Sequence, residues 1–146
     1  MAQNIEYNIY ARIMTQLENI SGTGDYNYRV VPDDIYGEFK MPEEVPKGQD
    51  HPVLCVGEFR TSSSLMRRRN DFEIPVSYEI WGYIRDSKDP MGAALKLESD
   101  IRIAIAGDED LNHLVTEMDF ETSLGAHEGL GIVLFVVRAT ANYDTA

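Results

Sequence analysis

Residues 73–107 read EIPVSYEIWGYIRDSKDPMGAALKLESDIRIAIAG, and this stretch decides the fold. Up to Ile84 it alternates apolar and polar side chains with the period of two that is typical of a half-buried strand. Asp89 then stands where a helix N-cap belongs, and Pro90 takes the first helical position. The stretch therefore predicts a long strand followed by an amphipathic helix that ends at Gly107. The expected inward residues are Ile74, Val76, Tyr78, Ile80 and Ile84 on the strand, and Ala94, Leu97, Ile101, Ala104 and Ile105 on the helix.

The flanking segments add another helix and further strands. Helical spacing of apolar residues predicts a helix over residues 4–20. Alternation predicts strands over 26–30, 53–60, 115–124 and 132–143, with a glycine-rich turn over 125–131. This order predicts a single α+β domain over residues 1–146, with a mixed, mostly antiparallel β-sheet and two amphipathic helices packed mainly on one face.

Two segments depart from the regular pattern. Between Pro32 and Pro52, prolines and glycines predict a long irregular excursion with a short edge strand near residues 35–39. The polar segment 61–71 predicts a protruding β-hairpin arm, and it carries the chain's one run of three basic residues. This cluster is either a solvated loop or a docking element for an acidic neighbour, and the sequence leaves both readings open. The candidate docking residues are Leu65, Met66, Arg67, Arg68 and Arg69.

The second face of the sheet also carries apolar side chains. Trp81 and Tyr83 share the outward face of their strand, and the first half of 132–143 is apolar on both faces. Such residues are expected to be covered, because large exposed aromatic patches are uncommon on soluble monomers. The chain's own helices are the simpler expected cover, and a neighbouring subunit is the alternative.

Composition and charge bound the function classes. The 146 residues include 13 basic and 25 acidic ones, which gives a formal net charge of −12. A surface this acidic repels nucleic acid, so tight duplex binding is not expected. Cys55 is the single cysteine and is expected to be a buried small hydrophobe in a reducing compartment. No apolar run reaches the length of a membrane span, and the first residues lack a secretory signal pattern.

Few residues suggest chemistry. Pro32-Asp33 followed by Glu38-Phe39-Lys40 is similar to the Pro-Asp…Glu-x-Lys nuclease signature, in which carboxylates hold a metal ion. Only four residues separate the two halves, too few for the two strands that normally present them. A small metal-dependent nuclease using Asp33, Glu38 and Lys40 is therefore only an alternative. No catalytic residue, metal site or cofactor is predicted.

The histidines and the acidic run after the helix also lack a ligand pattern. His51, His113 and His127 have no metal-ligand spacing and are expected to be solvated loop residues. Asp108-Glu109-Asp110 is expected to be a solvated turn, because three adjacent acids make a poor calcium loop.

The chain resembles the bacteriophage tail terminator family, also called tail completion or neck proteins. The helix segment is the most specific part, with Leu97-x2-Asp100-Ile101-x3-Ile105 followed by an acid and Leu111. The other matching segments run in order along most of the chain, although none is a strict signature. They are the helix ending in residues 22–28, the strands 51–56 and 74–84, the loop with Asp89-Pro90, and the final strand ending in 139–143.

This resemblance implies a structural virion protein of the tail or neck, assembled in the host cytoplasm, and not an enzyme. A hexameric ring of identical subunits would cap the tail tube, stop its polymerisation and join the head-side connector. The tube protein, the connector or neck protein and the sheath are the implied partners, and DNA would pass through the lumen without specific binding. A head-completion or tail-joining adaptor of the same neck is the alternative. The resemblance carries no catalytic or cofactor-binding residue.

Overall fold

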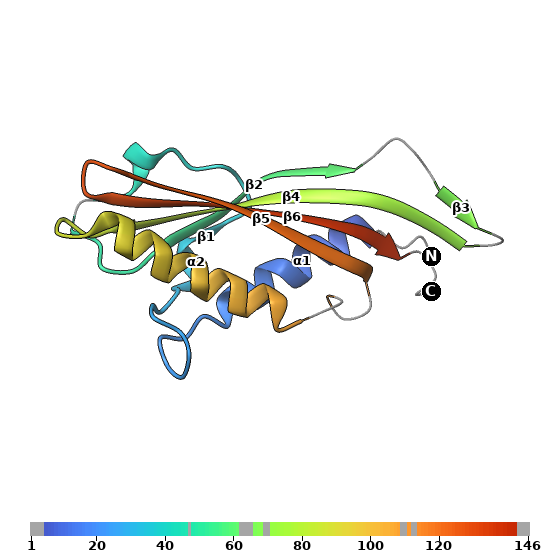
Figure 1. Ribbon diagram of the computed structural model, residues 1–146, viewed down its shortest axis with the longest axis horizontal. Helices are drawn as coiled ribbons and strands as arrows, with labels where there is room; N and C mark the ends of the chain where they lie inside the picture. Colours follow the sequence, from blue (N-terminus) through green and yellow to red (C-terminus); the bar gives the residue numbers. More distant parts are fainter. Residues whose placement is uncertain are drawn as a thin grey trace.

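Six strands form one sheet in the computed structural model, which describes residues 5–46, 48–61, 66–68, 71–108, 111 and 114–142 (Figure 1). The strands are β1 (Ile35–Tyr36), β2 (Val53–Thr61), β3 (Met66–Arg68), β4 (Asp71–Arg85), β5 (Val115–His127) and β6 (Leu130–Asn142). Five of them follow the order β1-β2-β4-β6-β5, and β3 pairs with β4 alone. β1 runs parallel to β2, and the other pairs are antiparallel. The predicted α+β class and mostly antiparallel sheet are confirmed.

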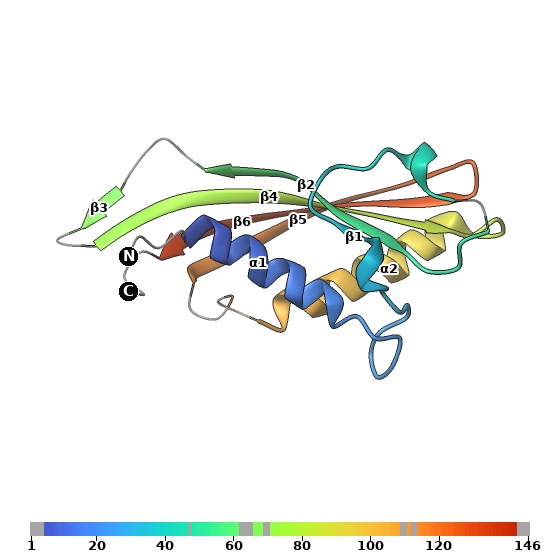
Figure 2. The same ribbon diagram turned by 180° about the vertical axis from the view of Figure 1, so that it is seen from behind.

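Both helices pack on the same face of this sheet, as Figures 1 and 2 show. They are α1 (Ile5–Glu18) and α2 (Pro90–Ala106). Two short 3-10 helices, η1 (Pro32–Asp34) and η2 (Pro42–Glu44), interrupt the excursion. The core lies between helices and sheet, where the burial of apolar surface supplies the main stabilisation. It includes Ile9, Ile13 and Leu17 from α1, Leu97 and Ile101 from α2, and Tyr78, Ile80 and Phe135 from the sheet.

The strand–helix unit forms as its sequence predicts. Val76, Tyr78, Ile80 and Ile84 of β4 are buried on the helix face. At the start of α2 the Asp89 carboxylate accepts a hydrogen bond from the Gly92 backbone N–H at 3.0 Å, which satisfies one of the free donors of the first turn. None of the described helices is long and apolar enough to cross a bilayer.

The predicted strand over residues 26–30 is wrong. Only an isolated bridge joins Ser21 to Arg29, and the segment is otherwise a loop held by Asp100. The fully buried Asp100 carboxylate accepts hydrogen bonds from the backbone N–H groups of Asn27 and Tyr28, each at 2.8 Å. Burial raises the pKa of Asp100, although these hydrogen bonds oppose the shift. The backbone N–H groups of Asn27 and Tyr28 therefore bond to a side chain of α2 and not to a neighbouring strand.

The predicted turn over residues 125–131 is too long. β5 continues to His127 and β6 begins at Leu130, so only Glu128 and Gly129 connect them. Both have positive φ, 51° and 76°, as the two central residues of a type I′ hairpin turn require. Met118, Phe120 and Leu124 of β5 pack against the core, which agrees with the predicted alternation of this strand.

Two residues expected in solvent have partners instead. The Asp108 carboxylate accepts hydrogen bonds at 2.7 Å from the Arg12 guanidinium and from the Gln16 amide, and so joins the end of α2 to α1. His51 contacts the Asp34 carboxylate through Nε2 and holds the end of the excursion against η1. His127 is exposed as predicted, but it is the last residue of β5 and not a loop residue, whereas His113 lies outside the described residues.

Candidate interaction surfaces

The residues of the nuclease alternative lie at the edge of the excursion. Lys40 forms an ion pair with Glu38 at 3.0 Å and lies 4.6 Å from the centre of the Tyr36 ring. Asp33 lies in η1, ahead of this pair. Among the described residues, no group of three or more His, Cys, Asp or Glu side chains is placed to hold a metal ion.

The excursion covers half of the sheet face that lies opposite the helices. Phe39 packs edge-on against Trp81 with ring centres 5.3 Å apart, and the Tyr83 hydroxyl donates to the Lys40 carbonyl at 2.7 Å. Beneath these contacts lies a second buried apolar cluster, which consists of Val45, Val53, Cys55, Tyr83 and Leu130. Trp81 and Tyr83 are therefore covered by their own chain, as expected, but by the excursion and not by the helices.

Cys55 lies inside this second cluster, and it is a free thiol. It has no exposed surface, and burial raises the pKa of its thiol. A thiol with a raised pKa is a poor nucleophile at neutral pH, because the thiolate is the reactive form. The predicted role of Cys55 as a small buried hydrophobe is confirmed.

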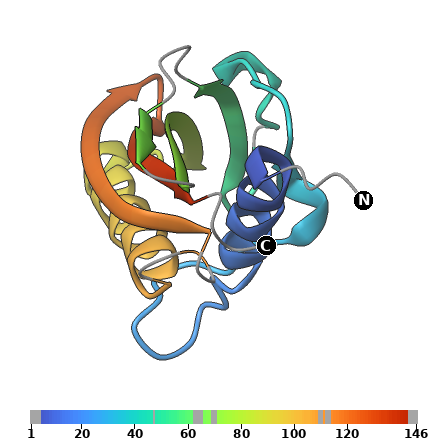
Figure 3. The same cartoon turned by 90° about the vertical axis from the view of Figure 1, so that its right-hand side faces the viewer.

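The other half of this face is an open hollow, which we call the trough. It runs across β2, β4, β6 and β5, and its larger part has a volume of about 510 Å³. Figure 3 looks along the strands from the β3 end and shows β2 and β5 rising on either side of β4 and β6. The trough is lined by Arg60, Ser77, Glu79, Asp119, Val136 and Arg138, among others.

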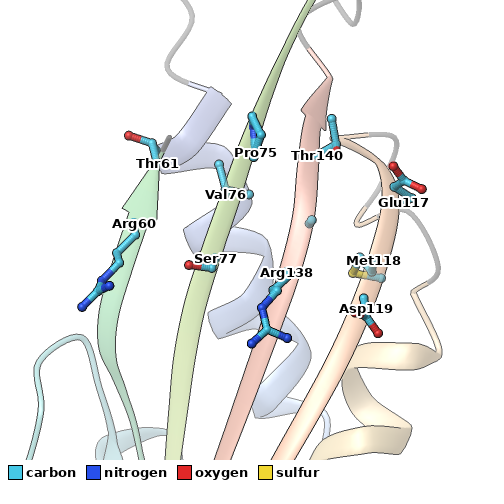
Figure 4. A pocket seen from close by; sticks show the side chains of 11 residues that line it. Arg60, Thr61, Pro75, Val76, Ser77, Glu117, Met118, Asp119, Arg138 and Thr140 are labelled. Carbon is cyan, nitrogen blue, oxygen red and sulfur yellow. The ribbon is translucent and has the colours of Figure 1, made fainter. Parts of the chain in front are cut away.

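A row of charged side chains crosses the trough (Figure 4). Arg60 and Arg138 flank Ser77, because both residues pair with it in register from the two neighbouring strands. Arg60 forms an ion pair with Glu58 and Arg138 one with Glu121, each at 2.6 Å. The two arginine side chains are 71% and 53% exposed, so solvent screens both ion pairs and each adds little to stability.

The trough is nevertheless acidic overall. Its lining includes four carboxylates, those of Glu58, Glu79, Glu117 and Asp119, against two guanidinium groups. Glu58 stands directly opposite Glu79 on the neighbouring strand, a like-charge pairing that destabilises a sheet. Within the described part of the chain, Glu79, Glu117 and Asp119 form no ion pair. This surface therefore favours a cationic partner.

The arm extends the β2–β4 hairpin past the main sheet (Figures 1 and 2). The last pair between β2 and β4 is Thr61 with Val76, and β3 then pairs with the first residues of β4, so that Arg68 lies opposite Asp71. β6 stays paired with β4 as far as Glu73, so only residues 71 and 72 of β4, about 7 Å at 3.3 Å per residue, extend past both β2 and β6. The predicted protruding hairpin is confirmed. Met66, Arg67 and Arg68 lie in β3, whereas Leu65 and Arg69 lie outside the described residues.

A third surface, on the outside of α2, was not anticipated. Met91, Leu95 and Ile103 are 43%, 52% and 36% exposed. Their spacing of four and eight residues places them along one side of the helix, away from the buried stripe. The sequence does contain a sign of this surface, because these three residues are apolar although they lie outside the helical stripe that faces the core.

No protein-family model matches the chain, and no curated protein matches it either. Among solved structures, the chain is similar to one from a particle described as "Virion of native gene transfer agent (GTA) particle", with 11% sequence identity. The alignment covers 94% of this chain and 93% of that chain, with a TM-score of 0.45. A likeness at this level carries no functional argument.

Proposed function

We propose that this protein is a structural component of a phage-like virion, a tail terminator that acts as a ring of identical subunits. One face of the ring caps the tail tube and stops its polymerisation, and the other face joins the head-side connector or neck protein. The sheath, where the tail has one, is a further neighbour. The identity of the role comes from the resemblance carried by residues 74–105, and the surfaces of the subunit support the assembly.

The observation that carries this proposal is the presence on one subunit of a basic arm and an acidic trough, which adjoin at Thr61 and Pro75. The arm carries the basic run that begins at Arg67, and the trough is acidic around Glu79 and Asp119. Two different surfaces that complement each other make a head-to-tail contact, and such contacts generate rings when the rotation closes. A subunit with these features is suited to assembly with copies of itself.

The net charge of −12 is compatible with the same role. DNA that leaves a virion has to pass through every ring of the tail. A wall with an excess of carboxylates repels phosphate groups and releases no counterions from DNA, so it does not retain the duplex. The role needs no chemical step, metal ion or cofactor, and we propose none.

Tube growth in the presence of the purified protein tests this function. A phage tail-tube protein would be polymerised with and without the chain, and tube lengths and ends would be measured by negative-stain electron microscopy. We expect short tubes with a ring at one end. A tube-length distribution that does not change with added protein would contradict the terminator role. Binding to the connector alone would instead indicate the neck adaptor.

A further inference from the structure

We infer that copies of this chain join edge to edge, with β5 of one subunit hydrogen-bonded antiparallel to the free part of β2 in the next. The inference rests on the proposed homo-oligomer and names the backbone contact that joins its subunits. Four features of the sheet lead to it: two open edges, the directions of their strands, the apolar side chains beside them, and their charges.

Both ends of the sheet carry a strand whose outer side meets no partner strand among the described residues. β5 has 13 residues and pairs with β6 alone. On the other edge, β1 covers β2 only at Leu54 and Cys55, so residues 58–61 lie beyond it. An open edge presents N–H and C=O groups that can pair with another chain. β5 is long for such a strand and contains neither lysine nor proline, the residues that commonly protect an edge.

The strand register shows which backbone groups point outward. His127 and Leu130 flank the two-residue turn and therefore form a hydrogen-bonded pair, and such pairs alternate along an antiparallel ladder. Thr122 lies opposite Phe135 in a non-hydrogen-bonded pair, so its N–H and C=O point away from β6. The same alternation, followed through β6 and β4, directs the N–H and C=O of Thr61 away from β4. The two threonines thus mark the two open edges.

The directions of the strands allow the pairing to continue from one subunit to the next. β2, β4, β6 and β5 alternate in direction, so β5 runs antiparallel to β2 within one sheet. A copy that is rotated about an axis close to the strand direction therefore brings its β2 antiparallel to β5 of the first copy. Each subunit then makes one contact through β5 and one through β2. Such a head-to-tail contact can close into a ring.

Apolar side chains at both edges are incompletely buried. Phe59 of β2 stacks on Tyr78 with ring centres 5.6 Å apart. Phe120 of β5 packs on Phe135 with ring centres 5.3 Å apart. Phe59, Phe120 and Leu124 are half-buried, and all three contact the core between sheet and helices. Pairing of the two edges would continue this apolar layer from one copy into the next, and the burial of these side chains would stabilise the contact.

Charge favours β2 over a second β5 as the partner. Glu117, Asp119 and Glu121 belong to β5, so two paired copies of β5 would bring like charges together. β2 carries Arg60 beside its one acid, Glu58. Like charges on neighbouring strands destabilise a sheet, whereas opposite charges stabilise it. The contact between β5 and β2 is therefore the one that the charges of the two edges permit.

Proline at the outward-facing positions tests this contact. Thr122→Pro removes an N–H that points away from β6, and Thr61→Pro removes one that points away from β4, so neither breaks a hydrogen bond inside the sheet. We expect each variant alone to assemble with an apparent Kd at least about tenfold higher than that of the wild type, because the new ladder loses a donor. Thr122→Ala and Thr61→Ala keep the N–H, and these matched controls should assemble as the wild type does.

A mixture of the two proline variants shows which edges meet. Each variant keeps one intact edge, so native mass spectrometry should find a 1:1 pair of about 33 kDa, twice the 16.5 kDa of one chain, that does not grow. Wild-type assembly by Thr61→Pro alone would show that β2 takes no part, and wild-type assembly by Thr122→Pro alone would show the same for β5. Either result, or a mixture without the pair, would overturn the inference and leave the terminator role standing.

Hydrogen–deuterium exchange of the wild type tests the contact without any substitution, and it decides the question if circular dichroism shows that a proline variant is unfolded. The amides of β5 should exchange more slowly in the assembled protein than after dilution to the monomer. β6 is paired on both sides and serves as the internal reference. Equal exchange of β5 in both states would contradict edge pairing. A wild-type protein that stays monomeric at every concentration would overturn both this contact and the proposed function.

Discussion

At the scale of single residues, close packing between α2 and the sheet depends on Gly131. A Cβ at this position would lie 2.5 Å from the Pro90 carbonyl oxygen and 2.9 Å from the Ala94 backbone nitrogen. Both atoms belong to the first five residues of α2, whose Pro90 and Asp89 cap fix where the helix begins. The glycine therefore lets the helix start directly over β6.

Gly131→Ala is expected to destabilise the protein by about 1–3 kcal/mol, because helix and strand have to separate to admit the methyl group. Urea denaturation followed by circular dichroism measures this loss. Gly125→Ala is the matched control, since a Cβ there meets no atom within 4 Å and the residue lies in the neighbouring strand β5. Equal stability of both variants would show that the close approach at Gly131 does not limit packing.

Asp86 is the residue with the clearest pH dependence. Its carboxylate accepts hydrogen bonds from the backbone N–H groups of Asp89 and Lys88, each at 3.0 Å, and these bonds lower its pKa from the usual 3.8. A carboxyl group with a lowered pKa in the folded state stabilises the fold at pH values above its unfolded pKa. That stability is lost as the pH falls through the folded value.

Asp86→Asn is therefore expected to be less stable than the wild type at neutral pH, with a difference that shrinks below about pH 4. Thermal denaturation across a pH series measures both curves. Asp25→Asn removes an exposed carboxylate that accepts no backbone hydrogen bond within the described residues, and it serves as the control. A wild-type advantage that grows at acid pH would contradict the assignment.

At the scale of elements, the excursion covers part of the sheet face that lies opposite the helices. It crosses from β1 to β2 and places Phe39 on Trp81, the single tryptophan of the chain. The indole N–H also donates to Glu79 at 3.1 Å, so Trp81 stands where the covered half of the face meets the trough. The fluorescence of this residue therefore reports on whether the excursion is in place.

Phe39→Ala is expected to shift the emission of Trp81 to the red, because the indole loses its edge-on partner and gains water. The pair contributes about 0.5–1.5 kcal/mol beyond area burial, so the fold itself should persist. Met41→Ala, at an exposed position of the same segment, is the control and should leave the spectrum unchanged. An unshifted spectrum in Phe39→Ala would mean that Phe39 does not shield Trp81.

The sequence predicts elements best where local signals agree. The β4–α2 unit combines alternation, a cap, a proline and a helical stripe, and both elements form at the predicted places. Residues 26–30 alternate like a strand, but the buried Asp100 supplies their hydrogen-bond acceptor from 73 residues away for Asn27. Residues 125–131 contain several glycines, yet only Glu128 and Gly129 have the positive φ that a two-residue turn needs.

The candidate site could be predicted only in part. The basic run at Arg67 and the hairpin that carries it follow from local pattern. The trough does not, because its charged row depends on the register of three strand pairs. Two of these pairs shift register, β5–β6 between Val115 and Met118 and β2–β4 between Val56 and Glu58, and the second shift places Glu58 opposite Glu79. The alternation of side chains along a strand does not reveal such a shift. The cover of Trp81 also could not be predicted, because it comes from a loop that is distant in the sequence.

At the scale of the whole molecule, three surfaces remain for partners: the trough, the arm and the outer side of α2. The first two complement each other in charge, and the third is an apolar line of Met91, Leu95 and Ile103. A subunit with surfaces on the helix side, on the sheet side and at one end can contact copies of itself and still present a face to other proteins. This arrangement suits the proposed position between a tube and a connector.

The mass of the purified chain in solution tests the central claim of self-assembly most directly. Native mass spectrometry over a range of protein and salt concentrations should find a closed species of about 99 kDa, six times the 16.5 kDa of one chain, with few intermediates. High salt should weaken it, because charge screening acts on the contacts at its surface. A single species of 16.5 kDa at all concentrations would contradict the account.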